Sequence, residues 1–431
     1  MTALTDPIFG HAPTRAHFSD EAWVGAMARA EIALAEAQSS LGLVPKAAAS
    51  EIAGLQAPCD VSDVLANGVA ASGVPVPALV DLLRRDLSPQ AADWLHYGAT
   101  SQDIVDTALI LCARAALEDH AANLTKLIDA LHTLSERHAG TLMLARTRGQ
   151  LATPVTFGLR VAQWAQPLIR LETQLDDLRA EALRVQLGGG AGSLSALGDT
   201  GPDIASKMAE ELGLSDGPPW HTDRSAIRQL GSWLGRLIAA TGKIGRDVSI
   251  QTRGEVAELR LTDAGSSSTM PHKANPVIAE ALQSLIPLAI GCEAGLAAAP
   301  VHSEERDGAN WPVEWALMPQ LFELAGAALS HADGLVRSLI VDADAMRARA
   351  EADPSVLAEA AVFALAPQVG RVEASRIVSQ ALASDTPLHA ALQAHGVVDW
   401  AQALSYDGFT RPASRVADQI FALRKTHRPG G

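Results

Sequence analysis

The sequence predicts an all-α protein built around a bundle of long helices. Apolar residues recur at steps of three or four for roughly 30 residues around Leu109 to Leu134, the spacing of one helix face. No segment alternates polar and apolar residues with the period of two that a half-buried strand shows. The helical period returns in four further segments: 155–187, 227–256, 277–298 and 313–340. Long helices joined by polar loops are typical of an elongated bundle.

Shorter helices are expected in the N-terminal part. Ser19 has the features of an N-cap before an acidic first turn, and the helix that follows is expected to end near Gly42. Residues 61–83 have a helical pattern but contain one glycine and two prolines, so we expect two short helices with a turn between them. Either Thr100 or Ser101 can cap the long helix behind it.

The pattern shortens again after residue 342. Pro354, Pro367 and Pro387 interrupt this part, which suggests a separate small domain. The sequence therefore predicts three domains: an N-terminal helical domain (1–103), a central long-helix bundle (104–342) and a small C-terminal helical domain (343–431).

The composition excludes several classes of protein. Of 431 residues, 48% are hydrophobic and 19% are charged, which fits a folded globular chain. The net charge of −15 argues against a nucleic-acid or anionic-membrane binder, although a local basic pocket can still hold an acidic small molecule. There is no signal-peptide pattern, no uninterrupted apolar window of about 18 residues, and no CxxC pair. We therefore expect a cytoplasmic protein without membrane, disulfide framework or zinc site.

Five polar segments interrupt the helical pattern: 96–103, 146–156, 188–198, 265–276 and 302–306. Each has a plain structural explanation when taken alone. A single histidine at a helix entrance is more often hydrogen-bonded than catalytic. The glycine run lacks both the Gly-Lys-Ser/Thr ending and the preceding strand of a phosphate loop, which favours a turn. The segment 302–306 lacks the HExxH spacing of a zinc site, so no metal is predicted.

The segment Gly265–Pro276 is the most informative of the five. Its glycine and serines can neither fill a core nor hold a helix, so it must be a loop. The loop carries hydroxyls, a lysine ammonium, an imidazole and an asparagine amide between residues that restrict the backbone. These are suitable groups for withdrawing a proton and stabilising the resulting oxyanion. A flexible linker is the alternative.

Taken together, three segments resemble the motif regions of the aspartase/fumarase superfamily. They are His96-Tyr-Gly-Ala-Thr-Ser-Gln-Asp103, Arg146-Thr-Arg-Gly-Gln-Leu-Ala-Thr-Pro154 and Ser266-Ser-Ser-Thr-Met-Pro-His-Lys-Ala-Asn-Pro276. The resemblance runs from about Phe18 to Ile340. It implies an all-α homotetramer with a central helical bundle, in which three subunits each contribute one motif region to an active site.

Within this superfamily, the segments 188–198, 219–224 and 305–315 are most similar to the 3-carboxy-cis,cis-muconate cycloisomerases. That similarity implies a cofactor-free lactonization of a muconate to a carboxymuconolactone, in aromatic acid breakdown by the protocatechuate/β-ketoadipate route. Adenylosuccinate lyase shares the first motif, but it has an upstream Arg-His-Asp segment and a histidine where this chain has Arg148. A non-catalytic scaffold of the same fold is the remaining alternative.

The absence of that histidine is compatible with a reaction whose leaving group needs no proton. Superfamily reactions remove a proton α to a carboxylate and expel a β leaving group, or run the addition backwards. An amine needs a proton before it departs, so an acid is valuable there. A carboxylate, which is released when a lactone opens, is already stable as an anion near neutral pH. Arg148 can instead bind one of three substrate carboxylates.

The resemblance assigns roles residue by residue. Alignment of the third motif puts the general base at Ser267. Because Ser266 occupies the position of the motif glycine, Ser266 and Ser268 remain alternatives. Lys273 is expected to stabilise the oxyanion, and Asn275 is expected to position Lys273 or the substrate carboxylate. His96 is expected to act as a substrate contact or as an acid. The expected neutral ligands of the carboxylates are Thr100, Ser101, Gln102, Gln150 and Thr153, and the expected charged ones are Arg146, Arg148, Arg224 and Arg306.

Overall fold

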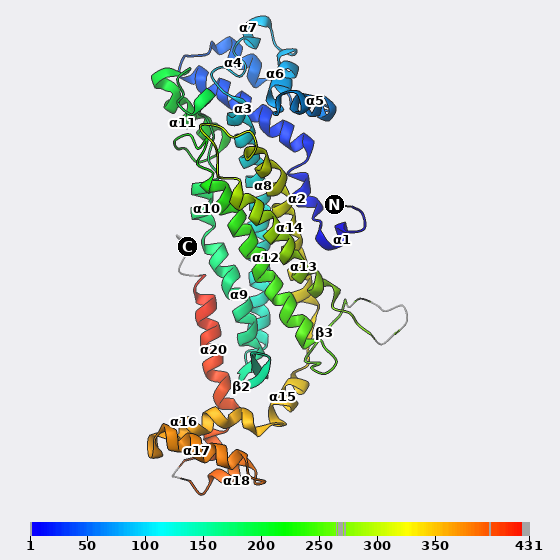
Figure 1. The fold of residues 1–431 in the computed structure, drawn as a ribbon, viewed down its shortest axis with the longest axis vertical. Coiled ribbons are helices and arrows are strands. Elements are labelled where there is room, and N and C mark those ends of the chain that lie inside the picture. Colours follow the sequence, from blue (N-terminus) through cyan, green and yellow to red (C-terminus); the bar gives the residue numbers. More distant parts are fainter. Residues whose placement is uncertain (1, 264, 266–269, 271–272, 396–397, 425–431) are drawn as a thin grey trace. The chain divides into compact units, whose positions relative to one another are not determined.

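The computed structural model describes residues 2–263, 265, 270, 273–395 and 398–424. The all-α prediction is confirmed, since helices make up most of the described chain (Figure 1). The chain divides into two compact units. The first unit comprises residues 1–123, 174–239 and 284–330, and the second comprises 124–173, 240–283 and 331–431. The division into three domains at residues 103 and 342 stays a prediction.

The N-terminal helices follow the predicted pattern. They are α1 (Asp6–Phe9), α2 (Ala12–Ala16), α3 (Asp20–Ser40), α4 (Lys46–Ala53), α5 (Ser62–Ser72), α6 (Val76–Arg84) and α7 (Pro89–Ala92). Ser19 caps α3, since its side chain accepts a hydrogen bond from the backbone N–H of Ala22 at 3.2 Å. Gly73, with a φ of 78°, ends α5 in the left-handed region and so produces the expected break before α6.

The long helices are α8 (Ser101–Arg137), α9 (Phe157–Thr173), α12 (Ser225–Gln251), α13 (Val277–Ala298) and α14 (Trp311–Ser338), and the shorter α10 (Leu175–Ala182) and α11 (Gly201–Leu212) lie between them in the sequence. The predicted range of α13 is confirmed. The single helix expected over 155–187 is wrong, because the chain forms two helices that end at Ala182.

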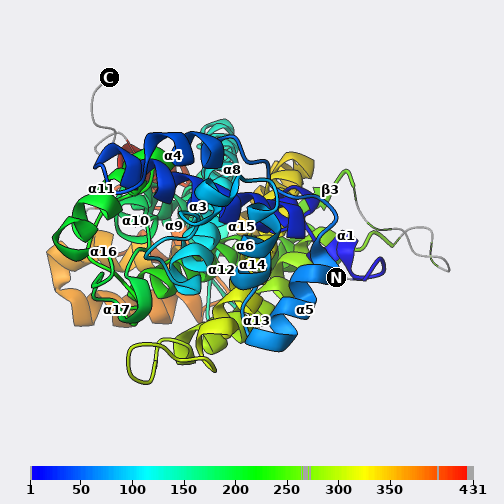
Figure 2. The ribbon, with the colours of Figure 1, turned by 90° about the horizontal axis from the view of Figure 1, so that it is seen from above.

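The core of the first unit lies where α3, α5, α6 and α11 pack against the start of α8. Buried residues from these helices form one cluster, which includes Met27, Leu79, Ile104 and Met208. In Figure 2, α4 and α11 are seen near α3, and contacts join α3 to each of them. This core holds the N-terminal end of α8, which carries the last residues of the first motif, in a fixed position.

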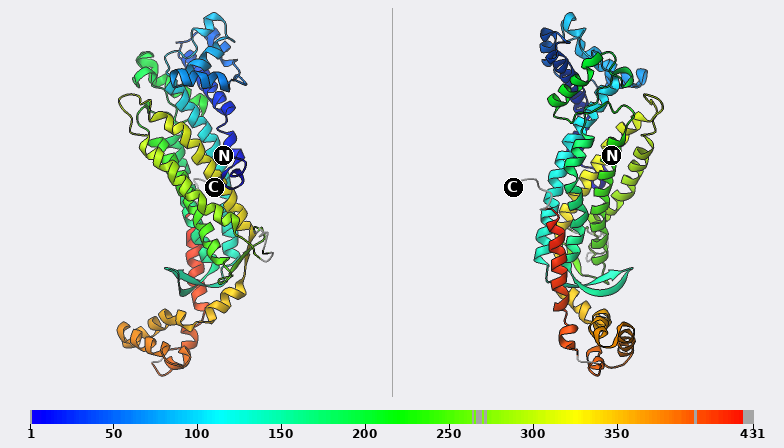
Figure 3. Two further views of the ribbon diagram at one scale, coloured as in Figure 1. Left: turned by 45° about the vertical axis from the view of Figure 1, so that its right-hand side comes forward. Right: turned by 90° about the vertical axis from the view of Figure 1, so that its left-hand side faces the viewer.

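The second unit contains a β-hairpin that the sequence did not reveal (Figure 3). Strand β1 (Leu142–Thr147) pairs antiparallel with β2 (Gln150–Thr156), and a short pair joins β3 (Leu259–Leu261) to β4 (Leu339–Val341). The expectation that no strand occurs is therefore wrong. The first three residues of β1 are all buried, so it lacks the alternation by which an exposed strand is recognised.

The C-terminal helices form the core of the second unit together with β1. They are α15 (Ala343–Glu351), α16 (Ala358–Val369), α17 (Arg371–Leu382), α18 (Leu388–Leu392), α19 (Trp400–Ala403) and α20 (Asp407–Ala422). Leu142 and Leu144 of β1 share a buried cluster with Leu365, Ile377 and Trp400. The hairpin is thereby fixed at its base.

Helix α13 is long and apolar enough to cross a membrane by length and composition alone. One side of it is nevertheless buried within the protein, through Ala279, Leu282 and Leu285. Amphipathic core helices of soluble proteins pass the same test, so this helix is weak evidence for a membrane.

Candidate active site

The first motif is held in place by the carboxylate of Asp103. Its Oδ2 accepts the backbone N–H groups of Thr100 and Gly189, both at 2.9 Å, and its Oδ1 accepts that of Gly188 at 2.8 Å. The bond to Thr100 is one half of a capping box at the start of α8. Burial raises the pKa of Asp103 to about 7, because desolvation of the charged form outweighs these three N–H groups. One fully buried side chain therefore joins the first motif to the glycine-rich segment.

The glycine-rich segment is a turn, as expected, and its N–H groups serve Asp103. It includes the 3₁₀ turns η1 (Gly189–Ala191) and η2 (Gly198–Thr200). A Cβ atom at Gly188 would lie 2.7 Å from Nδ1 of His221, so the close packing of this turn requires glycine there. The phosphate-loop alternative has no support, since two of its N–H groups are bound to a carboxylate.

Arg306 joins the same group of segments. Its Nε donates to Oε1 of Gln102 at 3.0 Å, and its Nη2 donates to the carbonyl of Gly190 at 3.0 Å. Nη2 also lies 3.1 Å from Nε2 of His221, while Nε2 of Gln102 donates to the backbone carbonyl of His221 at 2.8 Å. Burial and the charge of Arg306 lower the pKa of His221 to about 4, so its ring is neutral at physiological pH. Arg306 itself stays exposed, with its orientation fixed.

Arg224, in contrast to Arg306, is buried. Its Nη1 and Nη2 donate to the two carboxylate oxygens of Asp106 at 2.7 and 3.0 Å, and its Nε donates to Glu314 at 3.0 Å. All three side chains are fully buried, and the guanidinium stacks on Trp220. As a substrate ligand, Arg224 would have to give up these partners. The structure thus gives it a role in joining α8, α12 and α14.

His96 lies at the other end of the first motif in a left-handed backbone conformation, with a φ of 65°. Its Nδ1 is 2.7 Å from Oε1 of Glu31, whose side chain is fully buried. Burial opposes protonation of His96, but the hydrogen bond and the charge of Glu31 outweigh it and raise the pKa of the imidazole above its ordinary value.

Thr100 and Ser101 lie at the start of α8 and are half-buried. A helix N-terminus carries partial positive charge and attracts anions. The first unit therefore brings together, around Asp103, four predicted site residues: Thr100, Ser101, Gln102 and Arg306.

The predicted residues of the second motif lie on the hairpin of the second unit. Arg146 on β1 is bound to both carboxylate oxygens of the buried Glu258. Arg148 and Gly149 form the two-residue turn, with φ values of 53° and 81°, the backbone of a type I′ turn. Arg148 is exposed, and Gln150 and Thr153 lie on β2.

The serine loop is described only at its ends. Gly265 and Asn275 exchange two backbone hydrogen bonds, each 2.9 Å long, which close the loop. Lys273 is exposed, and its backbone N–H donates to the carbonyl of Met270 at 2.9 Å. The proposed base Ser267, with its alternatives Ser266 and Ser268, lies outside the described residues.

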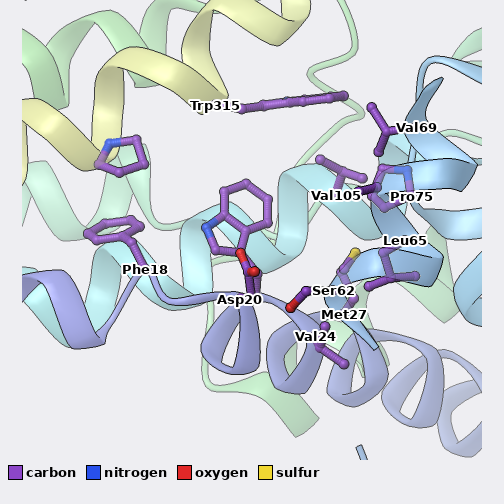
Figure 4. Close-up of a pocket in the computed structure, with 13 residues that line it drawn as sticks. Phe18, Asp20, Val24, Met27, Ser62, Leu65, Val69, Pro75, Val105 and Trp315 are labelled. Carbon is purple, nitrogen blue, oxygen red and sulfur yellow. The ribbon is translucent and has the colours of Figure 1, made fainter. Parts of the chain in front are cut away.

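A pocket of about 460 Å³ in the first unit offers a different environment (Figure 4). Trp315 of α14 lies on one side of it, and Met27 and Val24 of α3 lie on the other. Among the described residues that line it, the charged one is Asp20, an anion. A polycarboxylate needs cations, so this pocket does not fit the predicted substrate class.

Sequence reasoning missed the residues that support the site. Asp103, Gln186 and His221 hold its segments together, and Asp106 with Glu314 holds Arg224. Asp103 offered one signal, since an acidic residue three positions after the helix cap is typical of a capping box. The other partners are far apart in the sequence. Among the described residues there is no group of three or more His, Cys, Asp or Glu side chains that could hold a metal ion.

Comparison with known proteins identifies the class to which this helical chain belongs. Residues 1–291 match the lyase family. The chain is 40% identical over 389 residues to a 3-carboxy-cis,cis-muconate cycloisomerase of Pseudomonas aeruginosa, covering 88% of this chain and 84% of that one. It is 36% identical over 397 residues to a nitrosuccinate lyase of Streptomyces davaonensis, with 88% and 84% covered.

The crystal structure of the 3-carboxy-cis,cis-muconate lactonizing enzyme from Pseudomonas putida superposes with a TM-score of 0.90 at 34% identity, covering 99% of this chain and all of that one. The chain belongs to the fumarase/aspartase superfamily of lyases.

Proposed function

We propose that this protein is a 3-carboxy-cis,cis-muconate cycloisomerase, which closes its substrate to a carboxymuconolactone without a cofactor. The observation that carries the proposal is Arg148. It presents a permanent cation, at the exposed tip of a hairpin, where the related adenylosuccinate lyases carry an acid. The similarity to curated cycloisomerases over 88% of the chain supports the same activity.

In the proposed mechanism, a carboxylate of the substrate attacks the alkene, and electrons move toward the carboxylate conjugated with it. Lys273 and backbone N–H groups of the serine loop stabilise the enolate-like oxyanion that forms. Ser267 delivers a proton to the carbon next to that oxyanion, and Asn275 positions Lys273 or the carboxylate. In the reverse direction the deprotonated Ser267 acts as the general base.

Recognition of three carboxylates requires several cations. Arg306 is held by Gln102 and Gly190 and stays exposed, so its remaining N–H groups can bind a carboxylate. Arg148 supplies a second cation. Arg146 can contribute through the N–H groups that Glu258 does not occupy. Thr100, Ser101, Gln150 and Thr153 supply neutral hydrogen bonds.

The proposed active site is shared between subunits of a homotetramer, as the family resemblance implies. An exposed apolar face of α13 supports this assembly. Val277, Leu288 and Ile290 are exposed there, although a soluble protein gains free energy by covering such side chains. A second copy of the chain would cover them. The expected location is the cytoplasm.

A second candidate is the elimination of a stable anion from a substituted succinate. The similarity to the nitrosuccinate lyase favours it. Nitrite, like a carboxylate, leaves without needing a proton, so an arginine in the second motif is compatible with both reactions.

The test is an activity panel with purified protein. With a chelator present and no cofactor added, we expect turnover of 3-carboxy-cis,cis-muconate. Turnover of nitrosuccinate or adenylosuccinate instead would assign the protein to the eliminating lyases, and turnover of no superfamily substrate would favour the non-catalytic scaffold. Ser267→Ala is expected to reduce kcat by about 10²–10⁴, the usual range for general acid–base catalysis. Full activity of that variant, with loss in Ser266→Ala or Ser268→Ala, would move the base to the neighbouring serine.

A further inference from the structure

The contact between Glu31 and His96 joins a fully buried carboxylate to an imidazole ring. Glu31 lies in the middle of α3, its side chain is fully buried, and its Oε1 is 2.7 Å from Nδ1 of His96. The second oxygen, Oε2, is buried and has no hydrogen-bond partner among the described residues. A desolvated carboxylate is costly unless an opposite charge compensates it. The imidazole of His96, when protonated, supplies such a charge next to Oε1.

The surrounding backbone is arranged to keep this contact. His96 has a φ of 65°, a conformation that costs a non-glycine residue free energy and is retained only where other contacts hold it. The next residue, Tyr97, is tied to the same helix, because its carbonyl accepts a hydrogen bond from Nε2 of Gln38 at 2.7 Å. Glu31 and Gln38 are seven residues apart, which places them on one face of α3. Helix α3 therefore holds the His96 segment at two points.

The contact uses only one nitrogen of the ring. The side chain of His96 is 20% exposed, and its Nε2 has no hydrogen-bond partner among the described residues. With Nδ1 bound to Glu31, Nε2 is the ring atom that a ligand can reach. His96 is also four residues before Thr100, at the entrance of the motif that Asp103 fixes beside Arg306.

We propose that Glu31 is a positioning residue that keeps the His96 imidazole protonated and oriented, so that Nε2–H binds one carboxylate of a polycarboxylate ligand. This rests on the proposed function for the identity of the natural substrate, but carboxylate binding can be measured without turnover. Three charged groups from three helices act on His96: Glu31 of α3 and Asp103 of α8 favour its protonation, and Arg84 of α6 opposes it.

The protonation of His96 sets the direction in which carboxylate binding depends on pH. The cation is present below the pKa of His96, which Glu31 raises, and it is lost as the pH rises through that value. Binding of a carboxylate should therefore weaken on the alkaline side. Removing the charge of Glu31 should move this loss to lower pH, and the affinity below the shifted transition should stay the same.

The experiment measures binding of tricarballylate, a stable tricarboxylate, by calorimetry from pH 5.5 to 8.5. In Glu31→Gln we expect the alkaline loss of affinity to begin at a lower pH, and binding at a pH between the two transitions to be about tenfold weaker, as the loss of one charge-assisted hydrogen bond implies. Glu31→Asp, which keeps the charge, should restore most of the wild-type profile. Glu36→Gln, on the same helix, is the matched control and should leave the profile unchanged.

A second measurement does not depend on binding. Histidine labelled with ¹³C at Cε1 gives one NMR signal per ring, and His96→Gln identifies the signal of His96. We expect the pH at the midpoint of its titration to decrease in Glu31→Gln and to remain unchanged in Glu36→Gln. An unchanged midpoint, or an affinity loss that is equal at every pH, would overturn the proposal. Absence of turnover of 3-carboxymuconate with an intact titration shift would instead refute the proposed function alone.

Discussion

Arg146 is bound at both ends of its guanidinium fork by Glu258: Nη1 lies 3.0 Å from Oε2 and Nη2 lies 2.6 Å from Oε1. Glu258 is fully buried, and Nε2 of Gln251 donates to it as well, at 3.2 Å. The charged pair fixes the end of β1 that lies next to the turn with Arg148. Arg146 thus contributes to the position of the second motif in addition to any contact with substrate.

Removal of Glu258 should destabilise the protein strongly. We expect Glu258→Ala to lower the free energy of unfolding by about 3–5 kcal/mol, because it leaves the guanidinium of Arg146 without its charged partner. Urea unfolding measures this change. Glu255→Ala, at an exposed position three residues earlier, is the control and should stay within about 0.5 kcal/mol of the wild type.

Replacement of Arg224 should act through stability. Arg224→Met removes a buried cation from between Asp106 and Glu314, and we expect a loss of about 3–5 kcal/mol in the free energy of unfolding. Arg228→Met, at an exposed position in the first turn of α12, should change this free energy little. A variant at position 224 with normal stability and weak substrate binding would contradict this assignment and restore Arg224 as a substrate ligand.

Arg148 should show opposite effects on stability and on activity. Arg148→Asn is expected to raise the free energy of unfolding by about 0.5–1 kcal/mol, because asparagine tolerates the left-handed conformation better. The same change should lower kcat/KM by about 10- to 100-fold, the value of one charge-assisted hydrogen bond of about 1.5–3 kcal/mol. Thermal unfolding and steady-state kinetics measure the two effects. A drop in both quantities would mean that Arg148 supports the fold.

Stability should fall in mild acid through His120. Burial lowers the pKa of His120 to about 4, and its Nε2 donates to the carbonyl of Phe322 at 2.9 Å. At this side chain the unfolded state then binds more protons than the folded state between about pH 4 and pH 6.5, so the contribution of His120 to the free energy of unfolding decreases as the pH is lowered through this window. The contribution of His120 is about 3 kcal/mol at most.

The check is a set of urea unfolding curves between pH 4 and pH 7. We expect His120→Gln to reduce the pH dependence and the exposed His389→Gln to leave it unchanged. Part of the dependence should persist in His120→Gln, because burial and Arg306 also lower the pKa of His221 to about 4. An identical slope in wild type and His120→Gln would refute the prediction.

The sequence predicted the elements whose cause is local. The start of α3 at Ser19, the break at Gly73 and the whole range of α13 depend on caps, on glycine conformation and on helical period. The β1–β2 hairpin was missed because its turn carries Arg148 where asparagine or aspartate would have signalled it.

The partners of the site residues were missed for a different reason. Glu31 and His96 are 65 residues apart, and Arg224 is 118 residues from Asp106. No periodicity in a single sequence connects such positions, because tertiary packing alone brings them together. The presence of arginine and histidine residues in the motifs therefore indicated an acidic substrate. The sequence could not show that Arg306 is exposed and that Arg224 is buried.

The two-residue turn of the hairpin has a consequence for how new activities can arise. Its strands are held by their own register and by the buried base, so the side chain at position 148 can be exchanged without moving another residue. Histidine enters the left-handed region more readily than arginine does. A single codon change at this turn would exchange a fixed cation for a proton donor within an unchanged fold, which gives selection a direct way to alter the acid–base chemistry of the second motif.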